Sequence, residues 1–419
     1  MTFLFKHTFL IFCSLLLCSV AKAQSSYTLQ QALQTARVNN AALKTEQFNI
    51  GIAQADIITA RLRPNLVLNN QTLQLIQPAQ FPANTPWNNG QNRQVWWQLT
   101  KSIQLAGQRK YKIDVANKQL AFTEKNYTET ERNLFADVAA KWLEVWTAKK
   151  QLDILTIAKA NIDSLVMTNQ NRYKNQVITQ TELYRTELLS KQYAVQYKTA
   201  LQEISNRQKE LSFLLGTRDS ISIDTEDDFL FRIPPNIDSL LTQSLKTRSD
   251  ILSAQSLIEV ANSNIKLQKS LAYPQPELGL IYNPQNTIPY FGIYATIDLP
   301  FFDRNQGEIK KSFLLKEQAE QHFHKTQSQL QTEITTAYAS YQLQQQNVHN
   351  FQPVVQQSQT ILNHVKYAYL KGGTTIIDFL EAQRSWLETQ QQYYDALQQY
   401  RQSYIQLLYT TGLINQLAK

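Results

Sequence analysis

The stretch Tyr369–Gln383, YLKGGTTIIDFLEAQ, determines how the C-terminal part of the chain folds. Gly372 and Gly373 interrupt a helical pattern, so the chain can reverse its direction there. Thr374 or Thr375 can then cap a new helix, because a hydroxyl at this position accepts a hydrogen bond from a free backbone N–H. The stretch therefore predicts a helical hairpin whose second helix begins directly after the two threonines.

A degraded copy of the same stretch lies 196 residues earlier in the chain. The corresponding pairs are Tyr173 and Tyr369, Thr179 and Thr375, and Glu182 and Asp378. At the same offset Gly216 corresponds to Gly412, and each could end a helix in the left-handed conformation. We therefore predict an internal duplication, with one helical hairpin in each of the segments 24–216 and 237–419.

Residues 1–23 have the features of a secretory signal peptide. The apolar run Phe9–Val20 precedes a small-x-small cleavage pattern that ends at Ala23. Cys13 and Cys18 both lie in this segment, and each follows a residue too large for lipoprotein cleavage. We expect an exported protein without a lipid anchor, whose mature chain has no cysteine for disulfides, thiol catalysis or metal binding.

Charge and hydropathy narrow the class of protein further. The net charge of +8 combines residues of both signs along the whole chain, which indicates a solvated surface rather than a nucleic-acid site. After the signal, no segment has the roughly 18 consecutive apolar residues of a transmembrane helix. A membrane protein with this sequence would need strands that close into a barrel.

Four segments predict strands, at about 64–76, 94–105, 275–283 and 289–299. In the second and fourth, apolar residues alternate with polar ones, which is typical of a barrel strand with one face in lipid. The residues predicted to face lipid are Val95, Trp97, Leu99, Ile103, Phe291, Ile293 and Ile297. Because four strands cannot close a barrel and open edges are not tolerated in lipid, more than one copy of the chain is required.

The rest of the chain predicts helices. Long helices are expected at about 107–171, 180–215, 306–369 and 376–411, and shorter ones at 27–62 and 237–271. Apolar residues between positions 134 and 166 recur at the 4–3 spacing of a coiled coil. A helix of this length would extend about 100 Å at 1.5 Å per residue. The acidic, proline-containing segment 217–236 predicts a linker between the halves.

The duplicated plan, the helix–proline–strand junctions at Pro64 and Pro274, and the pattern Y-x-x-G-x-x-T-x-x-D at 369–378 resemble the TolC-like outer-membrane efflux proteins. The segments SIQLAGQR at 102–109 and LPFFDRNQGEI at 299–309 are similar to the CzcC-like, heavy-metal efflux branch. The resemblance implies a homotrimer with a 12-stranded β-barrel, four strands per chain, in the lipid of the bacterial outer membrane. The barrel would continue as a helical coiled-coil tunnel across the periplasm, with the linker in its equatorial region.

The same resemblance implies where partners act. A periplasmic adaptor (membrane fusion) protein and an RND-type inner-membrane pump would dock at the helical tips, in the turns that contain Gly372, Gly373, Thr375, Tyr173 and Thr179. Asp378, Glu381 and Glu182 correspond to acidic residues around the periplasmic entrance, and Tyr369 to a tyrosine that holds the entrance shut. The chain departs from the family at two positions. At Thr374 some members have an arginine that locks the closed state, and at Gln176 the first tip usually has a glycine.

A simpler interpretation of the acids stays open, since Asp378 and Glu381 could complement the positive end of a helix dipole. His322 and His324 are two residues apart and would point to different faces of a helix, so we expect no metal site there. The sequence contains no catalytic triad, phosphate loop or zinc-ligand spacing, so neither a cofactor nor enzyme activity is expected.

Three functions remain in competition. The first is a passive exit duct of a tripartite efflux system for heavy-metal cations or small toxic solutes. The second is a type I secretion duct for polypeptides, and the third is a soluble periplasmic coiled-coil scaffold or adaptor. The alternating strands at 94–105 and 289–299 argue against the third.

Overall fold

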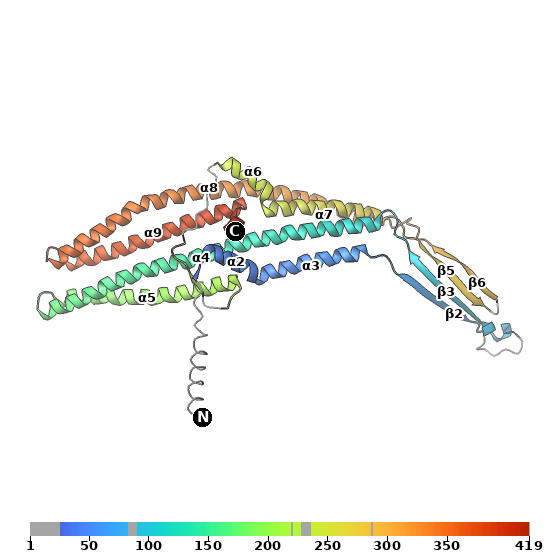
Figure 1. Cartoon of the computed structure of the whole chain (residues 1–419), viewed down its shortest axis with the longest axis horizontal. Coiled ribbons are helices and arrows are strands. Elements are labelled where there is room, and N and C mark those ends of the chain that lie inside the picture. Colours follow the sequence, from blue (N-terminus) through green and yellow to red (C-terminus); the bar gives the residue numbers. More distant parts are fainter. Residues whose placement is uncertain (1–25, 83–89, 219–220, 228–235, 286–287, 419) are drawn as a thin grey trace, which may run out of the picture. The chain divides into compact units, whose positions relative to one another are not determined.

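The computed structural model describes residues 26–82, 90–218, 221–227, 236–285 and 288–418. The predicted signal peptide and part of the predicted linker lie outside the described residues. The described residues form two compact units, one from 26–44, 130–247 and 330–418 and one from 45–129 and 248–329, without the gaps just given. Two long helices, α4 and α8, contribute to both units (Figure 1).

A four-stranded antiparallel sheet belongs to the second unit. Its strands are β2 (Leu66–Gln74), β3 (Arg93–Ser102), β5 (Glu277–Gln285) and β6 (Ile288–Thr296), in that order across the sheet. Within the described sheet, β2 and β6 each pair on one side, so both edges have free backbone groups. The helices of this unit are most of α3 (Ala41–Arg61), α7 (Ser249–Leu271) and the adjoining parts of α4 and α8.

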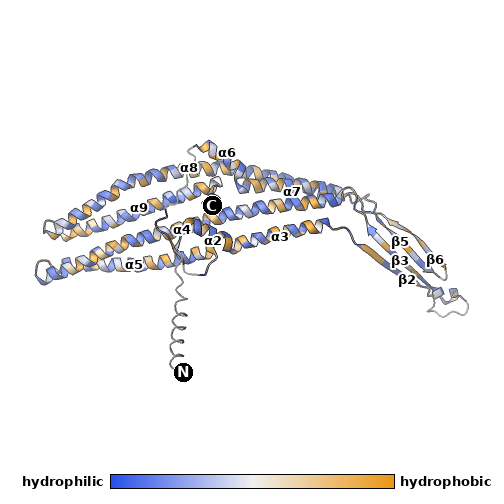
Figure 2. Ribbon diagram, in the orientation of Figure 1, coloured by the Kyte–Doolittle hydropathy of each residue, from blue (hydrophilic) through white to orange (hydrophobic). Residues whose placement is uncertain are grey.

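The strand register gives the sheet one apolar face. Residues directly opposite one another share a face, and one such row is Leu68, Leu99, Leu280 and Ile293. The next row on this face contains Trp97, Tyr282 and Phe291, and Ile293 is 84% exposed. The other face is more polar and has Gln98, Thr100, Gly279 and Gly292. Figure 2 shows that the strands contain residues of both kinds.

Five of the seven residues predicted to face lipid lie in strands, and the other two lie beyond the strand ends. Val95, Trp97, Leu99, Phe291 and Ile293 are in strands, whereas Ile103 and Ile297 follow the last residues of β3 and β6.

The reason for the early strand ends is Pro276, which precedes β5 at the position that would pair with both isoleucines. Proline has no N–H to donate, so the ladder ends after one further bond from Ile103 N to Pro276 O.

The first unit consists mainly of two helical hairpins. One joins α4 (Gln108–Lys174) to α5 (Gln180–Leu215), and the other joins α8 (Gln306–Leu370) to α9 (Ile376–Thr411). The helices have 67 and 36 residues in the first hairpin and 65 and 36 in the second. Pro353 lies inside α8, which continues through it. A shared apolar core includes Ile162, Leu189, Phe379 and Leu387 and holds the hairpins together near their turns.

Polar contacts establish the order of the four helices in this unit. Tyr341 stacks on Tyr400 and joins α8 to α9, while Gln151 donates to Asp395 and joins α4 to α9. Ser190 of α5 donates to Asp163 of α4 at 2.7 Å. The order is therefore α8, α9, α4, α5, which leaves α8 and α5 at the two ends of the layer.

Short elements cover one face of α4. They are β1 (Ser26–Tyr27), β4 (Ser222–Ile223) and α2 (Leu29–Asn39), whereas α6 (Ile237–Thr247) packs on α9, and η4 (Ile414–Ala418) on α2 and α9. The indole N–H groups of Trp142 and Trp146 donate to the carbonyls of Tyr27 and Thr225, and Lys149 donates to Ser222. The predicted linker thus contains a strand, β4, that pairs with β1 and packs on α4.

The predicted helix at 27–62 is divided in two at Asn40, which lies between α2 and α3. The Asn40 side chain accepts hydrogen bonds from the backbone N–H groups of Ala42 and Leu43. It therefore caps α3, as asparagine commonly does at a helix start.

Candidate functional site

The two hairpin turns of the first unit have the same capping chemistry. The hydroxyls of Thr179 and Thr375 accept from the backbone N–H groups of Glu182 and Asp378, and those acids accept from the threonine N–H groups in return. These are capping boxes, which satisfy two free N–H groups at a helix start. The threonines that the sequence singles out therefore fix where α5 and α9 begin.

The turns reverse through left-handed backbone conformations. Gly372 has a φ of 77°, which glycine adopts without steric penalty, and Gly373 N bonds to Ala368 O. In the first turn Gln176 adopts a φ of 58°. A residue with a Cβ in this conformation costs roughly 1–2 kcal/mol. The departure at Gln176 therefore keeps the shape of the turn at some cost in stability.

Asp378 is exposed and accepts three hydrogen bonds at its carboxylate. Thr374 Oγ1 and Thr375 Oγ1 each donate at 2.7 Å, and Thr375 N donates at 3.1 Å. These bonds, first among them the one from Thr374, hold the pKa of the Asp378 carboxyl below its usual value. Asp378 therefore carries a negative charge at neutral pH while it also caps α9.

The predicted acidic residues have different surroundings. Glu182, like Asp378, is bonded to the cap threonine of its own helix, which fits the simpler helix-end interpretation of these two acids. Glu381 is exposed one turn further along α9. A capping role and a role at an entrance are compatible, because an ionised cap still contributes its charge to the surrounding solution.

Tyr369 is 4% exposed and links three helices at the tip. Its hydroxyl donates to Asn169 Oδ1 of α4 at 2.9 Å, and Asn169 Nδ2 donates to Thr186 Oγ1 of α5 at 2.9 Å. Burial raises the pKa of the Tyr369 hydroxyl, so the group stays protonated and able to donate.

An aromatic ring and a guanidinium group also pack against the Tyr369 ring. Its ring stacks on Phe379 with the centroids 5.6 Å apart, and the guanidinium carbon of Arg172 lies 5.0 Å from its centroid. Tyr173, the counterpart of Tyr369 in the first hairpin, is half-exposed. The two hairpins are thus not equivalent at their tips.

Asn169, Arg172 and Thr186 are not among the residues predicted from the sequence, although one signal for Asn169 is present. The 4–3 spacing that includes Ile162 and Val166 continues to position 169, so a polar residue stands in an apolar seam. A buried asparagine at a seam position is typical of a partner-specifying contact. Asn169 is fully buried, in agreement with that rule.

Within the described residues, no helix combines the length and hydropathy needed to cross a membrane. No group of three or more histidine, cysteine, aspartate or glutamate side chains in this part of the chain could hold a metal ion. His322 and His324 are exposed on α8.

The C-terminal part of the chain matches a known protein family. Residues 240–413 match the family described as "Outer membrane efflux protein". The chain is similar to the probable efflux pump outer membrane protein TtgC of Pseudomonas putida, with 23% identity over 404 residues, 87% of this chain and 78% of that protein. It is also similar to the pyoverdine export outer membrane protein OpmQ of P. putida, with 22% identity over 275 residues. That match covers 62% of this chain and 57% of the relative.

Comparison with solved structures identifies the fold. The chain resembles the CmeC outer membrane channel of Campylobacter jejuni with a TM-score of 0.76 and 18% identity, over 92% of this chain and 85% of that one. The resemblance extends over both hairpins and the sheet, because it covers nearly the whole chain. The mainly helical, TolC-like fold predicted from the sequence is therefore confirmed.

Proposed function

We infer that this chain is an outer membrane efflux protein along its whole length and acts as the exit duct of a tripartite efflux system. The observation that carries the proposal is the four-stranded sheet, which exposes a mainly apolar face, interrupted by Asn70 and Lys101, and has two unpaired edges within the described residues. A water-soluble protein rarely exposes such a face, whereas lipid would cover it. The family match and the TolC-like fold support the same function.

A homotrimer would satisfy the edges of the sheet. If β6 of one copy pairs with β2 of the next, three sheets of four strands close into a 12-stranded barrel. Closure removes every free strand edge, which is a requirement in lipid. The proposed location is the bacterial outer membrane, with the helical hairpins in the periplasm.

The ends of the helical layer have surfaces suited to the same assembly. The exposed side of α5 contains Tyr184, Leu188 and Val195, and that of α8 contains Leu343, Val354 and Ile361. Each set recurs at helical spacing and forms an apolar stripe on one side of its helix. Because α5 and α8 are the ends of the layer, α5 of one copy would meet α8 of the next. We define these sets as the α5 stripe and the α8 stripe.

Replacing Leu188 with glutamate should separate the copies. Leu188 is 56% exposed, so the change leaves the single chain intact, but in a trimer it would bury a charge against the α8 stripe. We expect loss of most of the trimer in detergent, measured by light scattering on purified protein. Ser385→Glu is the matched control, because it adds the same charge at an exposed position on α9, which is not an end helix. A Leu188→Glu protein that stays trimeric would contradict this arrangement.

We also propose that Asp378, Glu381 and Glu182 line the periplasmic entrance. Tyr369 would hold the entrance shut through its hydrogen bond to Asn169, which we call the tether. In a trimer, Asp378 and Glu381 would place six carboxylates around the opening and favour cations. The double variant Asp378→Asn and Glu381→Gln should lower the cation preference of single channels in planar bilayers. Asparagine can still accept the cap bonds, so α9 keeps its start. Glu388→Gln, on the same helix, is the control, and equal selectivity in both proteins would remove these acids from the entrance.

The substrate class follows from the relatives and from one part of the sequence. The names of the relatives refer to pyoverdine export and to toluene and antibiotic efflux, and these small solutes support efflux over polypeptide secretion. The CzcC-like segments suggest heavy-metal cations as a further class. In the structure, however, Gln108 and Asn305 of these segments bond to backbone carbonyls of α7 and the residues after it. We therefore propose small toxic solutes as the substrate class, with metal cations among them. We also propose that the tips dock to an adaptor and an RND-type pump.

A further inference from the structure

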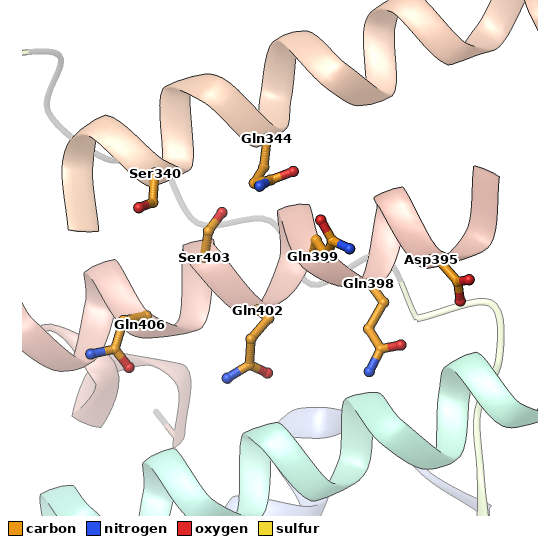
Figure 3. Close-up of a pocket in the computed structure, with 8 residues that line it drawn as sticks. All are labelled: Ser340, Gln344, Asp395, Gln398, Gln399, Gln402, Ser403 and Gln406. Carbon is orange, nitrogen blue, oxygen red and sulfur yellow. The ribbon is translucent and has the colours of Figure 1, made fainter. Parts of the chain in front are cut away.

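An open cleft of about 670 Å³ lies along α9 in the first unit. Figure 3 shows its lining, in which amide and hydroxyl side chains of α9 and α8 predominate. The lining residues are Ser340, Gln344, Asp395, Gln398, Gln399, Gln402, Ser403 and Gln406. None of these described residues is basic, and Asp395 is the one carboxylate among them.

The cleft lies on a different side of the helical layer from the short elements that cover α4. On α9, Tyr394 and Arg401 pack against the Trp146 ring, whose N–H bonds to Thr225 among those short elements. Each residue step turns a helix by about 100°, so Asp395 and Gln402, each one step further, point well away from that side. The layer thus has a covered side and an open, amide-lined side.

The open side continues from α9 onto its neighbours. A second cleft is lined partly by amide and hydroxyl side chains, namely Gln151 of α4, Gln196 and Thr199 of α5, and Gln391 of α9, and also by one carboxylate, Glu203, and four apolar residues. The hydrogen bond from Gln151 Nε2 to Asp395 Oδ1, 2.7 Å long, joins the two clefts. Uncharged polar groups of this kind hold water on both donors and acceptors but hold no ion strongly. The α5 and α8 stripes are at the ends of the layer, and of their residues Val195 of the α5 stripe also lines the second cleft.

We propose that the open side of α9, with Gln402 and Gln406, lines the water-filled conduit and that Asp395 gives this part of the conduit its preference for cations. The inference rests on the proposed function, because it requires an assembled channel. If the ends of the layer join neighbouring copies and one side is covered by short elements, the remaining side faces the lumen. Solutes would pass as hydrated species along an amide wall, with three Asp395 carboxylates at one level.

Thiol modification in open channels tests this assignment. The two cysteines of the sequence, Cys13 and Cys18, lie before residue 24, so a Gln402→Cys protein produced without residues 1–23 has a single target. We expect a cationic methanethiosulfonate reagent to lower single-channel conductance in up to three steps, one for each copy. Glu226→Cys is the control, since this side chain is 84% exposed on the covered side, and its modification should leave conductance unchanged.

A second variant tests the carboxylate. Asp395→Asn keeps an acceptor for Gln151 and should shift the reversal potential in a salt gradient toward that of a less cation-selective channel. Complete labelling of Gln402→Cys, verified by mass spectrometry, with unchanged conductance would overturn the assignment while leaving the exit-duct function intact. A wild-type protein that forms no channels would overturn both, so the two failures are distinguishable.

Discussion

Replacing Gly279 with alanine should prevent assembly of the proposed trimer. A Cβ at this position would lie 2.3 Å from the carbonyl oxygen of Leu99 and 2.7 Å from the Cα of Thr100, both in the neighbouring strand β3. Backbone atoms cannot move aside as a side chain can, so β3 and β5 would have to separate. We expect a loss well above the ~1 kcal/mol of a typical substitution, because this change disrupts the centre of the sheet.

The measurement is the amount of heat-resistant oligomer in outer-membrane extracts, compared with wild type. Gly292→Ala is a close control, because Gly292 lies on the same face in β6 and its added Cβ would meet the Ile281 side chain at 3.2 Å. That side chain can shift, so the Gly292→Ala protein should assemble. Normal amounts of oligomer in the Gly279→Ala protein would show that β3 and β5 do not pair as closely as in this structure.

The second large effect is expected at Tyr369. Replacement by alanine removes the stack on Phe379, the contact with Arg172 and the hydrogen bond to Asn169. Removing a buried aromatic side chain costs about 3–5 kcal/mol. We expect the second hairpin to detach from α4 near its turn, which would raise single-channel conductance several-fold if Tyr369 holds the entrance shut.

Two further variants distinguish the effect of the Tyr369 ring from that of its hydroxyl, and the effect of this tyrosine from that of another tyrosine on the same helix. Tyr369→Phe keeps the ring but leaves Asn169 Oδ1 without its donor, which costs about 1–3 kcal/mol in a buried site, so its conductance should be intermediate. Tyr367→Ala changes a tyrosine that is 66% exposed on the same helix and should behave as wild type. Equal conductance in the Tyr369→Ala and Tyr367→Ala proteins would exclude Tyr369 as the tether.

The parts of the fold that the sequence predicts correctly are those that local patterns determine. Caps and glycines fix the hairpin turns because their chemistry acts over three or four residues, as at Thr375 and Gly372. Alternation identifies the apolar face of the sheet because side chains in a strand alternate between two faces. The ends of β3 and β6 were predicted wrongly because their limit is set by Pro276, which is distant in sequence and becomes a neighbour only when β5 pairs.

Less of the candidate site than of the fold could be predicted from the sequence, and the physical reason is the same. Tyr369 can be identified within its own turn, but its partners Asn169 and Thr186 lie in the other hairpin. The covering of α4 by β1 and β4 depends on two short segments that have no periodicity of their own. Contacts between distant segments depend on packing, which neither spacing nor composition specifies.

The unequal burial of Tyr173 and Tyr369 has a consequence for whatever binds the tips. In a closed ring of three chains the six turns would be of two kinds and would alternate, one kind tethered through its tyrosine and the other without that tether. A ligand that contacts all six must therefore offer two different contact surfaces in turn around the circle. A symmetric hexamer with six identical contacts would fit at most three of the turns well.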